Sequence, residues 1–315
     1  MRVYLQISVK RIPIKKYKFN MNSKDFYSDG EVENDLLSIF SSKNSKLLIK
    51  NILSNNPSWP MRYHLSPLRK NILDWYDFKS EESLLEIGAG CGAITEVFCS
   101  KLRKVVAIEL SKLRSEIISC RHKDKNNLTV IAGNISNIKI NEKFDYVSLI
   151  GVLEYAGKYT HTQDPYFDFL LEAKSFLKIN GILIIAIENK FGLKYWAGCR
   201  EDHTGKFFDS IENYPENKDI QTFGKYELKE VLKRAGFHNL SFYYPTPDYK
   251  FPTEIFSDNY LPTIGHNITT SSFPFRDYSQ DRKYIFSEKL AIDNIIVNRQ
   301  FDFFSNSFLI FAKQK

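Results

Sequence analysis

Apolar runs of strand length alternate with segments of helical period from residue 83 to the end of the chain. The apolar runs predict seven strands, at 83–88, 105–110, 128–133, 144–151, 181–188, 237–245 and 307–314. The segments between them predict helices at 93–102, 111–122, 164–177 and 225–235. Because most of these strands are apolar on both faces, we expect a mainly parallel sheet with helices on both sides. The fold class is therefore α/β, and ligands of such sheets bind at the carboxyl ends of the strands.

The chain before this sheet is harder to assign. Residues 1–60 are predicted to be an N-terminal extension, with short strands within 3–14 and a helix at 32–40. A further helix is expected at 63–75, starting near Ser66, whose side chain suits an N-cap ahead of a proline.

The second half of the chain, where the aromatic residues concentrate, contains two long connections. We assign residues 61–315 to one domain, with insertions at about 189–222 and 246–304 that are rich in aromatic and polar residues. Long connections at the ligand-binding edge of a sheet are usually binding loops or lids. Both insertions are therefore expected on the substrate side of the pocket.

The stretch LLEIGAGCGAIT, at 84–95, joins the first predicted strand to the first helix. Gly88, Gly90 and Gly92 let the backbone turn sharply there and approach a ligand closely. A helix N-terminus follows at once and presents its unpaired N–H groups to the same space. The spacing also fits the dinucleotide fingerprint, so the glycines alone predict a nucleotide site and leave NAD open.

Polar residues near the ends of three predicted strands narrow the choice of nucleotide ligand. Glu86 precedes the first glycine by two residues, and Glu109 ends the second strand, where a carboxylate can bind both ribose hydroxyls. Asn134 and Ile135 follow the third strand and suit the amino edge and the ring face of adenine. Each polar residue has a plainer explanation, because acids are favourable near a helix N-terminus and Asn is an ordinary turn residue.

This constellation resembles the class I S-adenosylmethionine (SAM) dependent methyltransferases over about 84–188. The resemblance implies a seven-stranded Rossmann-like sheet with SAM as the cofactor. It also implies that the glycine turn holds the methionine and ribose, that the acid after the second strand binds the ribose, and that the pair after the third strand binds adenine. Many members carry Asp where this chain has Asn134. The residues assigned to the cofactor site are Tyr63, Glu86, Gly88, Ala89, Gly90, Gly92, Glu109, Leu110, Asn134, Ile135 and Gly151.

Composition and charge set limits on the function. The 315 residues include 44 basic and 37 acidic side chains, and the net charge of +7 favours an anionic partner only weakly, since the basic residues are scattered. Four cysteines without a C-x-x-C pattern, and no histidine at metal-ligand spacing, predict free thiols and no metal site. The N-terminus lacks the apolar core of a signal peptide, and no apolar run is long enough to span a bilayer, so we expect a cytoplasmic protein.

Methyl transfer to a hydroxyl needs an aligned acceptor and a base that takes its proton. His203 is the predicted catalytic base, because Glu201 and Asp202 beside it can raise its basicity and fix its tautomer. A hydrophilic turn is the plainer explanation of this segment. The other candidate bases are His64, His161, Glu154 and Asp202. The Pro-Pro-aromatic motif typical of base-directed N-methyltransferases is absent after the fourth strand, which argues against a nucleic-acid substrate.

The outer segments resemble a narrower group. The motifs YHLSPLR, ENKFGLKYWAG followed by EDHTG, YYPTPDYKFPT and NSFLIFA are similar to methyltransferase modules of bacterial surface-polysaccharide assembly. The resemblance implies O-methylation of a sugar hydroxyl, on a nucleotide sugar or a glycan end, with glycosyltransferases of the same pathway as partners. Aromatic insertions suit sugars, whose apolar ring faces stack on aromatic side chains. The alternatives are an amine or phosphorus-containing acceptor, or a SAM-binding module without activity.

Overall fold

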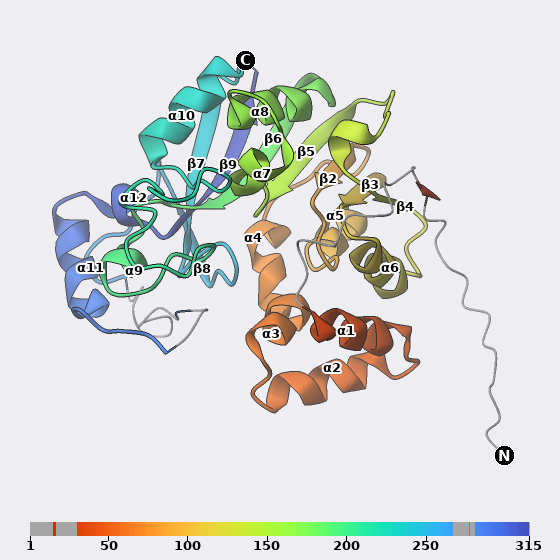
Figure 1. Ribbon diagram of the computed structural model, residues 1–315, viewed down its shortest axis with the longest axis horizontal. Coiled ribbons are helices and arrows are strands. Elements are labelled where there is room, and N and C mark those ends of the chain that lie inside the picture. Colours follow the sequence, from red (N-terminus) through yellow and green to blue (C-terminus); the bar gives the residue numbers. More distant parts are fainter. Residues whose placement is uncertain (1–14, 17–29, 267–276, 278–280, 315) are drawn as a thin grey trace.

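The computed structural model describes residues 15–16, 30–266, 277 and 281–314, and it contains a central sheet between layers of helices (Figure 1). Within these ranges the sheet has nine strands. They are β1 (Lys15–Lys16), β2 (Ser83–Ile87), β3 (Lys104–Glu109), β4 (Leu128–Ala132), β5 (Phe144–Ile150), β6 (Leu177–Glu188), β7 (Asn239–Thr246), β8 (Glu254–Ser257) and β9 (Ser307–Lys313). Their order is β1-β4-β3-β2-β5-β6-β9-β7-β8. The short strands expected within 3–14 lie outside the described residues.

The seven predicted strands form the body of this sheet, and β1 and β8 extend its two edges. The predicted number of seven was therefore too low, because a two-residue and a four-residue strand carry no periodic signal. The strands from β1 to β6 pair in parallel, whereas β9 runs antiparallel between β6 and β7. The chain goes from β2 to β3 and β4 on one side and then returns to β5 on the other. This reversal places a topological switch point between β2 and β5.

Helices cover both faces of the sheet, as predicted. Leu84 of β2 lies in a buried cluster with residues of α4 and α5, and Leu85 lies in a second cluster with residues of α8 and α10. The alternation follows from the period of two along a strand. The helices of the described ranges are α1 (Glu31–Ser41), α2 (Ser45–Ser54), α3 (Trp59–Leu65), η1 (Pro67–Lys70), α4 (Asn71–Asp74), α5 (Thr95–Lys101), α6 (Lys112–Arg121), η2 (Ile135–Asn137), η3 (Leu153–Tyr155), α7 (Ala156–Tyr159), α8 (Pro165–Ser175), α9 (Leu193–Trp196), α10 (Lys225–Arg234), α11 (Glu288–Val297) and α12 (Phe301–Phe304).

The N-terminal helices pack against the sheet domain through α6. The helix expected at 32–40 is present as α1, and its Glu33 accepts a buried hydrogen bond of 2.7 Å from Arg114 of α6. The single helix expected at 63–75 is instead divided into α3, η1 and α4. Ser66 marks the division because Pro67 follows it and favours an extended backbone there. The Ser66 hydroxyl caps η1 by accepting from the Leu68 N–H.

The described residues of the two expected insertions contain little regular structure. Residues 189–222 contain α9, and 246–304 contain β8, α11 and α12. Part of the apolar core reaches this region, since Ile292 and Ile296 of α11 pack in the same cluster as α8 and α10. Nowhere in the described ranges is a helix both long and apolar enough to cross a membrane.

Candidate functional site

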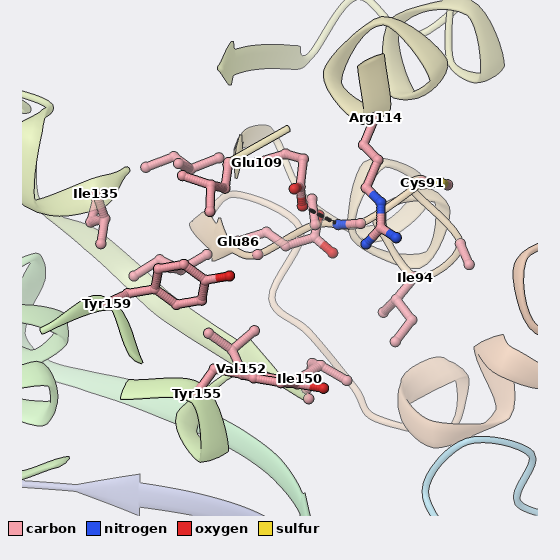
Figure 2. A pocket seen from close by; sticks show the side chains of 18 of the residues that line it. Glu86, Cys91, Ile94, Glu109, Arg114, Ile135, Ile150, Val152, Tyr155 and Tyr159 are labelled. Atoms are coloured by element: carbon pink, nitrogen blue, oxygen red, sulfur yellow. Dashed lines mark hydrogen bonds between the residues drawn. The ribbon is translucent and has the colours of Figure 1, made fainter. Parts of the chain in front are cut away.

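A cavity lies at the carboxyl ends of β2, β3, β4 and β5, next to the switch point (Figure 2). Ten of the eleven residues assigned to the cofactor from the sequence line it. They are Tyr63, Glu86, Gly88, Ala89, Gly90, Glu109, Leu110, Asn134, Ile135 and Gly151. These residues come together because parallel strands end at the same edge of a sheet. Tyr63 reaches the cavity from α3, outside the sheet, and the guanidinium carbon of Arg69 lies 4.2 Å from the centre of its ring.

The glycine turn is held against β3 by its backbone. The N–H groups of Gly88 and Ala89 donate to the Ile108 carbonyl at 2.9 and 3.0 Å. Gly88 has a φ of 74°, and a β-carbon there would lie 2.5 Å from a methyl carbon of Val152, so only glycine fits. Gly90 has a φ of 56° but has open space where its side chain would be. The backbone at Gly90 can therefore approach a ligand in the cavity closely.

The structure places Gly92 away from the cavity, unlike the other assigned residues. Its missing side chain faces α6, where a β-carbon would lie 3.0 Å from the Nε2 atom of His122. That nitrogen in turn lies 2.8 Å from the Gly92 carbonyl oxygen. The sequence spacing grouped Gly92 with Gly88 and Gly90, but its position supports the turn from behind.

Backbone donors fix the carboxylate of Glu109. Gly90 N–H donates to its Oε2 atom at 2.7 Å, and Ser111 N–H donates to Oε1 at 3.0 Å. The Ser111 hydroxyl caps the start of α6 by accepting from the Arg114 N–H. Glu109 thus accepts hydrogen bonds from the backbone of the turn and of the start of α6, and it also lines the cavity. A role at the start of the helix is therefore compatible with a role in binding ribose.

Glu86 lies almost fully buried in the floor of the cavity. The Thr95 hydroxyl donates to its Oε2 atom at 2.7 Å. Burial raises the pKa of Glu86 from 4.5 to about 8, although the Thr95 hydroxyl counteracts this effect. A cationic ligand group next to Glu86 would favour its ionised form, which suits the ammonium of a bound amino acid.

The wall beside β4 and β5 combines Asn134 and Ile135 with aromatic residues that the sequence analysis did not assign. The Asn134 side chain accepts from the Ser136 N–H at 3.1 Å, so it performs the ordinary turn role as well as lining the cavity. Tyr155 and Tyr159 line the cavity from η3 and α7, directly after β5 (Figure 2). Their spacing of four residues after a predicted strand was a usable signal.

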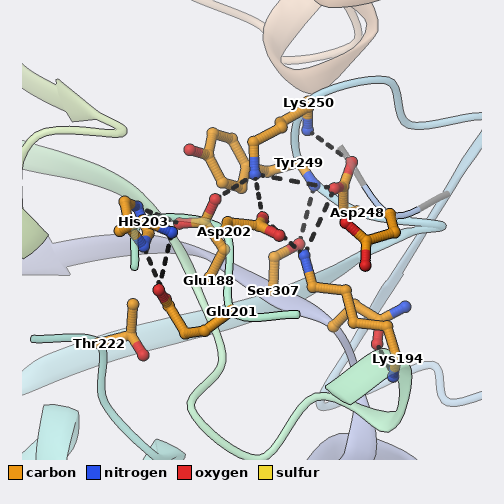
Figure 3. Close-up of polar contacts among 12 residues, drawn as sticks. Glu188, Lys194, Glu201, Asp202, His203, Thr222, Asp248, Tyr249, Lys250 and Ser307 are labelled. Atoms are coloured by element: carbon orange, nitrogen blue, oxygen red, sulfur yellow. Dashed lines mark hydrogen bonds and ion pairs between the residues drawn. The ribbon is translucent and has the colours of Figure 1, made fainter. Parts of the chain in front are cut away.

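His203, the predicted base, does not line the cavity. Its ring packs edge to face against the Tyr155 ring, with 5.3 Å between centroids, so one side chain separates it from the cavity. Its Nδ1 atom lies 2.7 Å from Glu201 Oε1, which confirms the contact expected with that acid. Its Nε2 atom lies 3.7 Å from both Glu154 Oε1 and Glu188 Oε2. Figure 3 shows His203 with Glu188 and Glu201.

The surroundings of His203 affect its expected role as a base that accepts a proton. Burial alone would lower the pKa of the ring, but Glu201 and Glu188 outweigh burial and raise the pKa well above its usual value. In this arrangement the imidazole is charged at neutral pH and has no lone pair with which to accept a proton. Asp202, the second expected partner, instead pairs with Lys194 and Lys250 at 2.8 and 2.6 Å.

The sequence of this chain is similar to those of known methyltransferases, over the region that lines most of the cavity. Residues 85–185 match the family model described as "Methyltransferase domain". The chain is 30% identical over 131 residues to a ubiquinone biosynthesis O-methyltransferase of Pelagibacter ubique, covering 39% of this chain and 51% of that protein. It is 27% identical over 153 residues to a ribosomal RNA small subunit methyltransferase A of Bacillus mycoides, covering 48% of this chain and 51% of that protein.

The chain spans about half the length of the curated relatives it matches. Among solved structures, it is similar to a phosphoethanolamine N-methyltransferase of Haemonchus contortus, with a TM-score of 0.47 and 13% identity over 91% of this chain and 50% of that one. The family match covers β2 to β6 and includes most of the cavity wall. Residues 85–185 are thus similar to a methyltransferase domain.

Proposed function

We propose that this protein is a SAM-dependent O-methyltransferase that acts on a hydroxyl of a sugar, carried by a nucleotide sugar or a glycan end. The observation that carries the proposal is the cavity itself, in which a glycine turn and two buried acids face aromatic side chains across the ends of β2 and β5. The relative from Pelagibacter ubique, an O-methyltransferase by name, supports a hydroxyl acceptor.

The cofactor side of the cavity is built from rigid parts. When bound, SAM supplies a methyl group activated by a sulfonium sulfur. Gly90 offers open backbone, and the Glu109 carboxylate, fixed by two backbone donors, can accept hydrogen bonds from ribose hydroxyls. Glu86 can ionise toward the ammonium of the methionine portion, since a nearby cation lowers the pKa that burial has raised.

The acceptor side is aromatic. Tyr63, Tyr155 and Tyr159 line the cavity. Trp59 and Phe251 extend this surface, with ring centroids 5.6 and 6.4 Å from that of Tyr63. Flat aromatic faces suit the apolar face of a sugar ring. The pocket can therefore orient a hydroxyl toward the methyl group. Such orientation is a large contribution that a protein can make to the rate of an in-line transfer.

Calorimetry tests the cofactor half of this proposal. We expect saturable binding of SAM and not of NAD. Glu109→Gln should weaken SAM binding at least tenfold, and Glu116→Gln on α6, outside the cavity, should not. NAD binding in place of SAM, or equal affinities for the two variants, would contradict the assignment of the cavity.

An acceptor panel tests the other half. Nucleotide sugars, reducing-end glycans and primary amines are incubated with the protein and SAM, and products are identified by mass spectrometry. We expect a gain of one methyl group on a sugar oxygen. Methylation of amines alone would favour the N-methyltransferase alternative, and SAM binding without any product would favour the module without activity.

A further inference from the structure

We propose that Glu154, Glu188 and His203 form a binding site for a divalent transition-metal cation, of which Mn²⁺ is the representative, beside the methyl-transfer cavity. The site joins three segments: η3 after β5, the end of β6, and the loop after α9. One ligand atom from each residue lies within 4.8 Å of the other two. Its role in acceptor activation, argued below, rests on the proposed function, whereas binding of the cation does not.

The spacing of the three ligand atoms suits a cation better than it suits hydrogen bonds. The Nε2 atom of His203 lies 3.7 Å from Glu154 Oε1 and from Glu188 Oε2. A hydrogen bond between nitrogen and oxygen would need about 3 Å. Two ligands of one metal ion, each about 2.0–2.3 Å from it, lie about 3.0–3.6 Å apart. A small inward movement of the side chains would therefore bring all three donors within bonding distance of one cation, with its remaining positions left to other ligands.

The carboxylates also carry unmet bonding capacity. Glu188 is fully buried, and its Oε2 atom, which faces His203, has no hydrogen-bond partner. Glu154 is 1% exposed, and its Oε2 atom likewise has no partner. A buried carboxylate oxygen without a partner is costly, and the usual solutions are a cation or a metal ion.

Local charge and the orientation of the histidine favour a divalent cation. Five carboxylates, those of Glu154, Glu188, Glu201, Asp202 and Asp248, lie around three cationic side chains, those of Lys194, Lys250 and the protonated His203. Both lysines contact Asp202, and Lys250 also contacts Glu188 Oε1, which leaves Glu188 Oε2 to face the histidine Nε2 atom.

The carboxylate of Glu201 completes the pattern of a metal-binding histidine. It receives the hydrogen of His203 Nδ1 at 2.7 Å and is held by the N–H groups of His203 and Thr204 at 2.7 and 2.8 Å. A carboxylate on one ring nitrogen fixes the tautomer in which the other nitrogen can bind a metal. Without a metal ion the ring also carries a proton on Nε2, and binding of the cation displaces that proton, because metal ligands bind in their deprotonated form. Here that other nitrogen faces Glu154 and Glu188.

The donor set indicates which ion binds. Two carboxylate oxygens and one imidazole nitrogen suit Mn²⁺, Fe²⁺ or Zn²⁺, because Ca²⁺ and Mg²⁺ prefer all-oxygen sites. Sequence spacing predicted no metal site here, since the three ligands are far apart along the chain. They meet only because β5 and β6 are parallel neighbours whose carboxyl ends lie together.

The position of the site gives the cation a chemical role. A β-carbon on Gly151, which lines the cavity, would lie 3.6 Å from Glu154 Oε1, and Tyr155, which also lines it, packs on His203. A cation between these walls can bind the acceptor hydroxyl and lower its pKa. The hydroxyl proton then leaves to solvent, the oxygen bonds to the methyl carbon, and the carbon–sulfur bond breaks to leave S-adenosylhomocysteine.

Electron paramagnetic resonance tests binding directly. The protein is treated with EDTA, desalted and titrated with Mn²⁺, and free Mn²⁺ is followed by its signal. We expect one saturable site, displaced by Zn²⁺. Glu154→Gln and His203→Ala should each weaken Mn²⁺ binding at least tenfold while SAM binding, measured by calorimetry, stays within threefold. Glu109→Gln should do the reverse and retain Mn²⁺ binding.

Two results would overturn the proposal. One is the absence of saturable Mn²⁺ and Zn²⁺ binding in wild-type protein that binds SAM. The other is unchanged Mn²⁺ affinity in both ligand variants. Once an acceptor is known, turnover that is equal in EDTA and in Mn²⁺ would remove the activating role. Since the resonance titration needs no acceptor, failure of the sugar assay would leave this test intact.

Discussion

Replacing Gly88 and Gly90 by alanine separately distinguishes the packing role of the turn from its ligand-binding role. Both residues have positive φ, which costs an alanine about 1–2 kcal/mol. Only Gly88 meets a neighbour, since its β-carbon would lie 2.5 Å from Val152 Cγ2. Overpacking of this kind adds about 1–3 kcal/mol. We therefore expect Gly88→Ala to lower the free energy of unfolding by about 2–5 kcal/mol, and Gly90→Ala by about 1–2 kcal/mol.

Gly88→Ala should lose more stability than Gly90→Ala, whereas Gly90→Ala should lose more SAM affinity than Gly88→Ala. Gly90→Ala fills open space on the cavity side, so its main effect is expected on SAM binding. Urea unfolding followed by tryptophan fluorescence gives the stability, and calorimetry gives the affinity. Adding Val152→Ala should recover about 1–3 kcal/mol in the Gly88→Ala background, beyond its own cost, because it removes the clash.

Equal losses of stability in the two alanine variants would contradict a clash between residue 88 and Val152. A double mutant Gly88→Ala with Val152→Ala that shows no favourable interaction energy would contradict it as well. In the first case the close approach to Val152 would have no energetic weight, and in the second the strain would come from φ alone.

Three further predictions follow from single contacts. Burial raises the folded-state pKa of Glu86 from 4.5 to about 8, so the contribution of this residue to stability is present below pH 4.5 and is lost as the pH rises to 8. The stability of Glu86→Gln should therefore increase relative to that of the wild type between pH 5 and 8.5, as measured by urea melts. Glu33→Gln removes the carboxylate charge from the buried ion pair with Arg114 of α6 and should cost about 3–5 kcal/mol. Glu31→Gln, exposed on the same helix, should change stability by less than about 0.5 kcal/mol. Gly92→Ala should destabilise the protein through its positive φ and its contact with His122 but leave SAM affinity within threefold, and a larger loss of affinity would return Gly92 to the ligand site.

The fold could be predicted from the sequence wherever burial on both faces left a continuous apolar run. The strand β2 is buried at all five positions, and the neighbouring strands follow the same rule, so their existence and order along the chain were readable. The edges were not readable, because β8 has only four residues and gains its place by pairing with β7. Ser66 was read correctly as a cap, but the extended backbone ahead of Pro67 ends one helix there as well as starting the next.

Some residues of the candidate site could likewise be predicted from the local sequence, and others could not. Glu86, Gly88, Gly90 and Glu109 could be assigned because a βα turn fixes their geometry locally. His203 could be noticed from its acidic neighbours, but not its actual partners, since those depend on which strands end beside one another. Glu201 met the expectation and Asp202 did not, because buried lysines outside the local sequence attract it.

The end of β5 links the cofactor cavity to the proposed cation site. Gly151 follows the last residue of this strand and lines the cavity, while Glu154, three residues later in η3, points into the buried cluster with Glu188 and His203. A side chain at Gly151 would meet the hydroxyl oxygen of Tyr249 at 2.8 Å and Glu154 Oε1 at 3.6 Å. This glycine, the last residue of the fourth predicted strand, therefore lies close to both sites. An acceptor hydroxyl held between them would face the methyl group on one side and the carboxylates on the other, which is the arrangement that transfer to oxygen requires.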